Sequence, residues 1–183
     1  MTRLLLFLAV LLGGCASVQR PPVAERQPAP QAFVVAANSL AAEAGMAVLR
    51  RGGSAVDAAV AVQAMLSLVE PQSSGVGGGA FLHLYEGRTG RLTLYDGREV
   101  APAGATAAMF LGPDGKPLSF AQAVTSGRST GVPGVIRMLE LAQREHGRLP
   151  WSGLFSEAER TARDGFIVSP RLARLVQSFA PRL

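Results

Sequence analysis

Three sets of residues in this chain could support chemistry by their type and position. Ser73 and Ser74 are adjacent hydroxyls just before a glycine-rich run. Arg98 precedes Glu99 at the end of an apolar stretch, and Cys15 ends a leucine-rich one. A serine needs a neighbouring base to become a nucleophile, and no nearby histidine or lysine serves this pair, so we interpret both serines as hydrogen-bonding turn residues. A guanidinium differs, because its planar fork can bind a carboxylate unaided.

The histidines and one aspartate are weaker candidates. His83 lies between two leucines of a predicted strand, which favours a packed histidine over a ligand. His146 lies near a predicted helix C-terminus, where a histidine suits the helix dipole. Asp57 is expected to cap a helix. No cluster of histidine, cysteine and acidic residues has the spacing of a metal site, so we expect neither a metal nor a cofactor.

Composition places the chain among globular proteins without a nucleic-acid partner. Its 183 residues are 48% hydrophobic and 17% charged, with one cysteine, which excludes highly charged disorder and a disulfide scaffold. Lysine and arginine number 18 against 13 acidic residues, yet they are scattered, and only 6% of residues are aromatic. Nucleic-acid binders cluster their basic residues, often with stacking aromatics, so no nucleic acid is expected.

The N-terminus has the pattern of a leader followed by a tether. Residues 1–14 combine Arg3 with an apolar run too short for a mature membrane helix, which predicts a signal peptide. The ending Leu-Gly-Gly-Cys resembles the bacterial lipobox and predicts lipidation of Cys15; the alternative is an ordinary signal peptide with an incidental cysteine. Residues 15–31 hold four prolines and no apolar periodicity, as in an extended tether.

The expected localisation follows from this leader. A lipidated cysteine anchors a protein to a membrane through its acyl chains. Ala16, rather than an aspartate, follows the cysteine, and by resemblance to bacterial lipoproteins this favours the outer membrane. We therefore expect a lipid-anchored protein of the bacterial cell envelope that faces the periplasm.

The body, residues 32–183, begins with an apolar run and two helices. Residues 32–37 are predicted to form a buried strand. A helix capped by Asn38 or Ser39 should end at the glycine pair 52–53.

A capping box of Ser54 and Asp57 predicts the start of the second helix. This helix runs to Val69 and is apolar almost all round, so it should be buried between layers. The four glycines in residues 75–79 indicate positive φ angles or close backbone contact. Because this run precedes a strand and lacks a Gly-Lys-Ser/Thr ending, we exclude a nucleotide loop.

A hairpin, a loop and three helices complete the predicted pattern. Strands over residues 80–85 and 92–95 form the hairpin, with Leu92 and Leu94 on one face. Arg98 and Glu99 follow the second strand, and a loop then extends through Pro117. The three helices are expected to open at residues 133–134, 152–153 and 170.

Several strings of this body resemble the gamma-glutamyltranspeptidase family. The main ones are GGSAVDAAVA at 52–61, VEPQSSGVGGG at 69–79 and DGREVAP at 96–102, and shorter pieces agree at 131–134, 147–151 and 162–166. The resemblance covers about residues 33–180 in order, and EPQSSGVGGG is its most specific part.

The resemblance implies an N-terminal-nucleophile hydrolase of the α+β class, an αββα sandwich made as a precursor that cleaves itself into two subunits. A threonine that begins the small subunit attacks a γ-glutamyl amide, such as that of glutathione, with its own α-amine as the base. No threonine of this chain lies in the expected Thr-Thr-His-type context. The chain is therefore expected to be the first part of the large subunit, an incomplete sandwich without a catalytic residue that is inactive without the small subunit.

The resemblance also assigns roles to the Asp-Gly-Arg-Glu string. Arg98 matches the family arginine that binds the α-carboxylate of the glutamyl substrate, and Glu99 is expected to orient this arginine or to stabilise the fold rather than to touch substrate. Two alternatives stay open. One is a cephalosporin acylase of the same family, with the same self-processing and a different acyl pocket. The other is a non-catalytic, lipid-anchored remnant that binds a partner or nothing.

Overall fold

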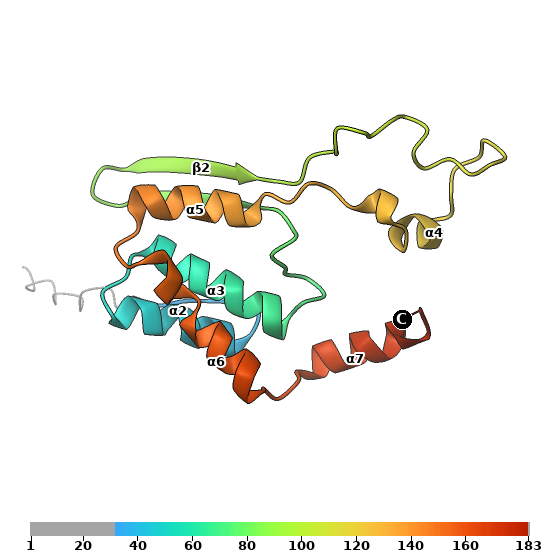
Figure 1. Ribbon diagram of the computed structural model, residues 1–183. Coiled ribbons are helices and arrows are strands. Elements are labelled where there is room, and N and C mark those ends of the chain that lie inside the picture. The colour runs from blue at the N-terminus through green and yellow to red at the C-terminus, as the bar shows by residue number, and fades with distance from the viewer. Residues whose placement is uncertain (1–31, 183) are drawn as a thin grey trace, which may run out of the picture. The chain divides into compact units, whose positions relative to one another are not determined.

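The computed structural model describes residues 32–182, so the predicted signal peptide, the tether and the lipidation site Cys15 lie outside the described residues (Figure 1). None of the described helices has the length and hydropathy needed to cross a bilayer. The helices and strands are α2 (Ser39–Arg50), α3 (Ala55–Val69), β1 (Ala80–Glu86), β2 (Arg91–Gly97), α4 (Phe120–Val124), α5 (Val135–His146), α6 (Ser156–Asp164) and α7 (Pro170–Phe179), with short 3-10 helices η1 (Gly127–Ser129), η2 (Trp151–Leu154) and η3 (Ala180–Arg182).

Helices α2 and α3 begin where their capping residues predict. Asn38 Oδ1 accepts a hydrogen bond of 3.0 Å from the Leu40 amide at the start of α2. At α3, the Ser54 amide donates to Asp57 Oδ2 at 2.8 Å, and the Asp57 amide donates to Ser54 Oγ at 3.1 Å. This reciprocal pair satisfies two amides that the helix itself cannot pair, so the predicted capping box is confirmed.

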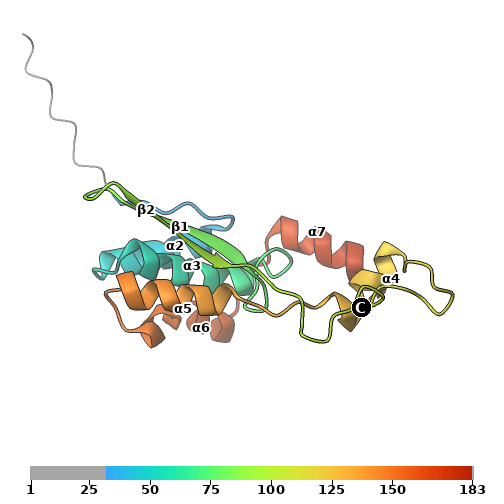
Figure 2. The same ribbon diagram turned by 90° about the horizontal axis from the view of Figure 1, so that it is seen from above.

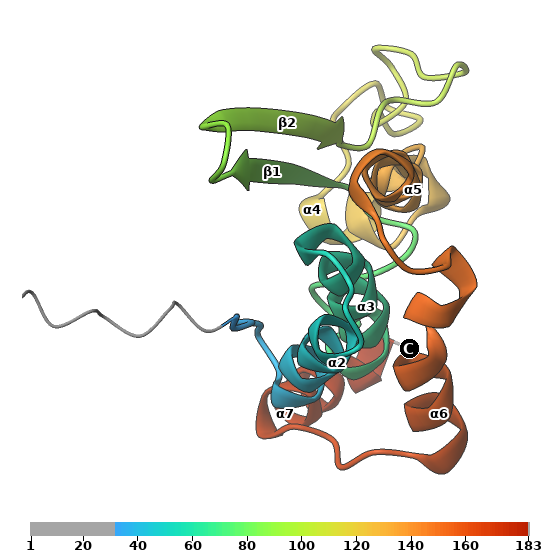
Figure 3. The same ribbon diagram turned by 90° about the vertical axis from the view of Figure 1, so that its left-hand side faces the viewer.

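Helix α3 forms the centre of the core. Figure 3 shows it between α2 and α5, with the hairpin beside α5. Every residue from Val56 to Val69 is buried or half-buried. Val60 and Ala61 of α3 share one core cluster with Leu139 of α5. On its other side α3 packs against α2 in a second cluster. The predicted burial of this helix between layers is confirmed.

The hairpin pairs β1 with β2 in antiparallel register, with Leu82 opposite Tyr95 and Leu84 opposite Thr93. Its inner face, which includes Leu82, Leu84 and the buried Tyr95, packs on the core. The predicted pairing of Leu92 and Leu94 on one face is confirmed. That face is the outer one, and it exposes Phe81, Tyr85, Leu92 and Leu94.

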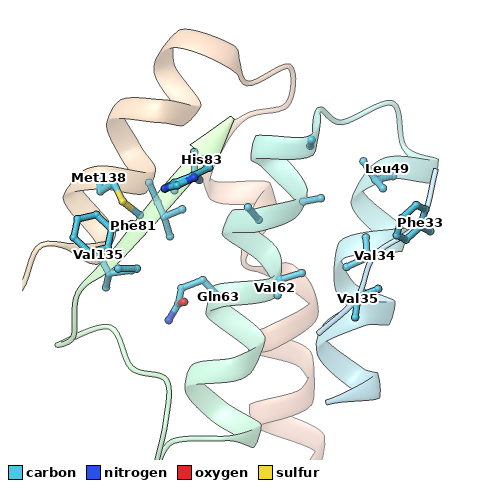
Figure 4. Close-up of a pocket in the computed structure, with 16 residues that line it drawn as sticks. Phe33, Val34, Val35, Leu49, Val62, Gln63, Phe81, His83, Val135 and Met138 are labelled. Carbon is cyan, nitrogen blue, oxygen red and sulfur yellow. The ribbon is translucent and has the colours of Figure 1, made fainter. Parts of the chain in front are cut away.

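The strand predicted at residues 32–37 does not form, and this prediction is wrong. The segment has no regular secondary structure, and Phe33 and Val35 are 80% and 84% exposed. A strand is defined by hydrogen bonds to a neighbouring backbone, and no such bond joins residues 32–37 to the rest of the described chain. An apolar cavity lies between this segment and β1 (Figure 4).

The segment between β2 and α5 is mostly loop, in agreement with the loop predicted through Pro117. Figures 1 and 2 show it leading away from α2 and α3 and carrying the short helix α4. Two isolated bridges organise it, one between Val100 and Val132 and one between Leu111 and Pro117.

The three later helices form, but the second begins later than predicted. Helix α5 starts at Val135 and α7 at Pro170, close to the expected positions. Helix α6 starts at Ser156, because the preceding residues form η2 instead. This 3-10 turn places Leu154 in the core, fully buried.

Candidate substrate-binding site

Arg98 lies just after β2, where three backbone segments meet without room for side chains. A Cβ added to Gly134 would lie 2.6 Å from the Gly97 carbonyl oxygen. The Gly134 and Val135 amides both donate to the Gly78 carbonyl, at 3.2 and 3.1 Å. The glycine-rich run, the end of β2 and the start of α5 are thus fixed to one another by close backbone contact. Of the glycines at 75–79, Gly79 makes the expected close contact, since an added Cβ would lie 2.7 Å from the Gly97 carbonyl oxygen, whereas Gly75 and Gly77 do not.

Arg98 and Glu99 form an ion pair at this junction. Arg98 Nη1 lies 2.7 Å from Glu99 Oε2, and the Arg98 side chain is 56% exposed. The Arg98 amide donates to Asp96 Oδ1 at 2.9 Å, which fixes the turn that carries the arginine. The Arg98 side chain is therefore accessible to a ligand and is carried on a backbone that is held in place.

Glu99 fits here because of a glycine. A Cβ on Gly79 would lie 2.6 Å from Glu99 Oε2 and 2.7 Å from the Gly97 carbonyl oxygen, and because this backbone atom cannot move aside, only glycine is accommodated at this position. The same oxygen is shielded from solvent and has no geometrically aligned hydrogen-bond donor among the described residues, so its contact with Arg98 is electrostatic. This contact fits the predicted role of Glu99 in orienting Arg98.

A cavity of about 520 Å³ opens beside this pair. Such a volume suits an amino acid or a small peptide. Its charged side chains are Arg98, Glu99 and Arg128. The remaining lining is backbone and small or apolar side chains from residues 77, 100–102, 109–110 and 129–131. The cavity can therefore bind a small anionic ligand by its carboxylate.

Glu70 anchors the start of the glycine-rich run, and the sequence analysis missed it. This carboxylate is only 2% exposed and accepts hydrogen bonds from Asn38, Gln72, Ser169 and Arg171. The hydrogen bond from Asn38 contributes most to holding the Glu70 pKa below its ordinary value, against the opposing effect of burial. The available signal was an acidic residue directly after an apolar helix, where the helix dipole disfavours it.

Asp57 is likewise buried and fully paired. Besides the Ser54 amide, it accepts hydrogen bonds from the Arg148 and Leu149 amides and from Gln143 Nε2. Burial would raise the pKa of this carboxyl, but the hydrogen bonds outweigh it and lower the pKa. The prediction that Asp57 caps a helix is confirmed.

The remaining candidates lie away from Arg98 or serve the backbone. The amides of Ser73 and Ser74 donate to the Glu70 carbonyl, at 3.1 and 3.0 Å, in keeping with turn residues. His146, near the end of α5, contacts the Tyr95 hydroxyl at 2.8 Å. His83 is exposed, so the prediction of a packed histidine is wrong. Odd-numbered positions of β1 face away from the core, so the flanking Leu82 and Leu84 lie on the inner face and His83 does not.

Within residues 32–182, no group of three histidine, cysteine or acidic side chains is close enough together to hold a metal ion.

Comparisons with known proteins agree with this geometry. The gamma-glutamyltranspeptidase family model matches residues 41–183. The glutathione hydrolase proenzyme of Bacillus subtilis is 42% identical over 151 residues, which are 82% of this chain and 26% of that protein. The chain thus spans about a quarter of the length of this curated relative.

Solved structures give the same result. The gamma-glutamyltranspeptidase from Pseudomonas nitroreducens, complexed with L-DON, superposes with a TM-score of 0.78 at 32% identity, over 84% of this chain and 45% of that one. The cephalosporin acylase from Bacillus halodurans has a TM-score of 0.65 at 28% identity, over 90% of this chain and 31% of that one. The predicted α+β class, an incomplete N-terminal-nucleophile hydrolase sandwich, is confirmed. From sequence and fold together, the chain belongs to the gamma-glutamyltranspeptidase family.

Proposed function

We propose that this chain is the substrate-binding first part of the large subunit of a γ-glutamyl hydrolase or transferase acting on donors such as glutathione. The observation that carries the proposal is Arg98, an exposed guanidinium on a fixed turn beside a peptide-sized cavity. A γ-glutamyl donor has a free α-carboxylate, which matches the planar fork of arginine. Glu99 orients this fork through the ion pair.

The attacking group of this proposed enzyme lies in a second segment, the small subunit. There the hydroxyl of an N-terminal threonine attacks the γ-amide carbon, and its own α-amine takes the proton. The amine of the substrate leaves with a proton, and water or an amino acid then takes the glutamyl group. The chain by itself should be inactive.

The outer face of the hairpin and the apolar cavity support the need for a partner segment. The cavity measures about 460 Å³, and Figure 4 shows Val62 and Gln63 of α3 between residues 33–35 and the β1 residues Phe81 and His83. A group of neighbouring exposed apolar side chains, such as those on the outer face of the hairpin, marks an interaction surface. We assign that surface to the small subunit.

The N-terminal leader extends the proposal to localisation. Lipidation at Cys15 would hold the enzyme at the bacterial outer membrane, facing the periplasm. Metabolic labelling with a palmitate analogue should mark the wild type and not Cys15→Ser. Equal labelling of both proteins, or a soluble wild type, would contradict the anchor.

A hybrid proenzyme tests the assigned function. Residues 32–183 replace the matching part of the Bacillus subtilis protein, and a chromogenic γ-glutamyl anilide reports turnover. The hybrid should cleave itself and turn over the donor, whereas the full chain alone should match a heat-killed control. Arg98→Lys keeps the charge but loses the fork, so kcat/KM should fall by an amount equivalent to roughly 2 kcal/mol with self-cleavage intact.

A second donor that lacks the α-carboxylate serves as the control. Wild type and Arg98→Lys should differ little on it if the arginine acts through that group alone. An equal defect on both donors would show that Arg98 does not bind the carboxylate. A hybrid that matures yet turns over neither donor would favour the non-catalytic alternative.

The cephalosporin acylase alternative is favoured by one finding, the fold similarity to the Bacillus halodurans enzyme. Assaying the same hybrid with a cephalosporin amide separates the two functions. A higher kcat/KM on that amide than on the γ-glutamyl anilide would favour the acylase.

A further inference from the structure

The Arg98 cavity contains a second arginine, Arg128, from a distant part of the chain. Arg128 belongs to η1, in the loop that precedes α5. Its Nη1 donates to the carbonyls of Met109 and Leu111, at 3.2 and 3.3 Å. These two bonds use both hydrogens of Nη1. Nε and Nη2, with three more hydrogens, have no acceptor among the described residues.

The loop around Arg128 is itself held in place. Ser129 Oγ donates to the carbonyls of Ser126 and Val124, at 3.0 and 3.3 Å. The Val100 amide donates to the Val132 carbonyl at 3.3 Å, and the Val132 amide donates to the Val100 carbonyl at 2.9 Å. These two bonds join the loop to Val100, the residue after Glu99. Both arginines of the cavity are thus carried on connected backbone, so the free donors of Arg128 are pre-oriented.

The charges of the cavity do not balance without a ligand. Arg98 is paired with Glu99, whereas Arg128 has no carboxylate partner among the described residues. The ligand site therefore carries one more positive charge than negative. In a γ-glutamyl donor whose only anionic group is its α-carboxylate, the α-ammonium group offsets that charge, so the carboxylate would use Arg98 and leave Arg128 unmatched. A second carboxylate on the same ligand would pair with it.

The dimensions of the cavity permit such a ligand. A spherical cavity of this volume would be about 10 Å across. In an extended γ-glutamyl-glycine, seven bonds separate the two carboxylate carbons by about 9 Å. One small dipeptide can therefore reach both walls of the cavity.

We propose that Arg128 is a specificity-determining residue that binds the carboxylate of the leaving amino acid or peptide. The site would then prefer γ-glutamyl donors whose leaving group ends in a free carboxylate over donors with a neutral leaving group. This inference rests on the proposed function and deepens it, because Arg98 binds one end of the donor and Arg128 the other.

The test compares two donors in the hybrid proenzyme, γ-glutamyl-glycine and γ-glutamyl-glycinamide, which differ by one carboxylate. Arg128→Gln should lower kcat/KM for the glycine donor about tenfold, mainly through KM, and change it less than twofold for the amide. Arg128→Lys keeps the charge and should retain part of the preference. The matched control is Arg88→Gln, in the exposed hairpin turn, which should leave both donors unchanged.

The donor ratio separates binding from a structural role. If Arg128 only holds its loop, both donors lose activity equally and the proposal is overturned; an unchanged ratio in Arg128→Gln overturns it too. If the unmodified hybrid is inactive, the proposed function is what fails. Calorimetric binding of glutathione and of its C-terminal amide to the full chain then decides: a preference for glutathione that Arg128→Gln abolishes supports the proposal, and equal affinities refute it.

Discussion

The helical layer, which is formed by α2, α3 and α5, differs from the Arg98 cavity in how completely its charged groups are hydrogen-bonded. In the helical layer, the carboxylates of Asp57 and Glu70 are each surrounded by donors and almost wholly buried. In the cavity, Glu99 Oε2 lacks an aligned donor, and Arg98 and Arg128 keep unused ones. Charged groups that are fully paired within the chain stabilise the fold, whereas those with unused capacity remain available to a ligand.

The largest loss of stability is expected for Asp57→Ala. The substitution removes the acceptor of three backbone amides and one side-chain amide in a buried place, which should lower the free energy of unfolding by about 3 kcal/mol. Urea unfolding of the full chain measures it. Asp164→Ala, at the exposed end of α6, is the control and should stay within about 0.5 kcal/mol. Similar losses for both would show that the burial and hydrogen bonds of Asp57 do not determine its contribution to stability.

A smaller loss in the free energy of unfolding, about 1.5 kcal/mol, is expected for Glu70→Gln. The NH2 group of the new side chain would face groups that now donate hydrogen bonds to the carboxylate, such as the Asn38 and Gln72 amides. The pH dependence sharpens this prediction. The Glu70 pKa is lowered in the folded chain, so its contribution is complete above its ordinary value of 4.5 and is lost as the pH falls. Between about pH 6 and pH 3 the variant should therefore lose less stability than the wild type.

Glu43→Gln provides the matched control for this pH series, because Glu43 is exposed on α2. Its urea midpoints should follow those of the wild type at both pH values. An acid-induced loss in Glu70→Gln as large as in the wild type would show that the Glu70 carboxylate contributes nothing to the pH dependence.

Tyr95→Phe should cost about 1 kcal/mol. The Tyr95 hydroxyl donates to Glu145 Oε2 at 2.6 Å. Burial is the main cause and this hydrogen bond the second cause that raise the pKa of Tyr95 to about 12. Tyr85→Phe is the paired control, since Tyr85 lies on the exposed face of the same hairpin. Because the chain has two tyrosines, Tyr85→Phe also leaves Tyr95 as the only group in an ultraviolet titration. A pKa near 10 there would contradict the described contact.

The smallest effect on stability is expected for Arg98→Lys, the variant with the large expected loss of activity. An exposed ion pair contributes little, so the free energy of unfolding should change by less than about 0.5 kcal/mol. Urea unfolding of the full chain provides the comparison with the kinetic loss in the hybrid. A stability loss comparable to that of Asp57→Ala would place Arg98 among the structural residues.

What could be predicted from the sequence was local. The capping box of Ser54 and Asp57 spans three residues, and its signal is complete within them. The alternation of β2 likewise revealed the shared face of Leu92 and Leu94. It could not reveal that this face is exposed, because burial depends on which layer covers it.

The failures concern contacts made far along the chain. The run at residues 32–37 has the composition of a strand, but pairing requires a neighbour that the described chain does not place there. Glu70 accepts hydrogen bonds from Ser169 and Arg171, about a hundred residues away, and the sequence around Glu70 contains no signal for those partners. Arg128 lines the same cavity as Arg98 although a long loop separates the two residues in the sequence. In the sequence, it could not be distinguished from the other scattered arginines.

The span of the Glu70 contacts has a consequence for synthesis on the ribosome. Arg171 follows Glu70 by 101 residues, so at typical elongation rates about 5 to 20 s pass between the two. During that interval the nascent chain can close the α3 capping box, yet the carboxylate at the other end of α3 has only Asn38 and Gln72 as partners. The Glu70 carboxylate, at the start of the glycine-rich run, therefore gains its full set of hydrogen-bond donors only after the start of α7 has been synthesised.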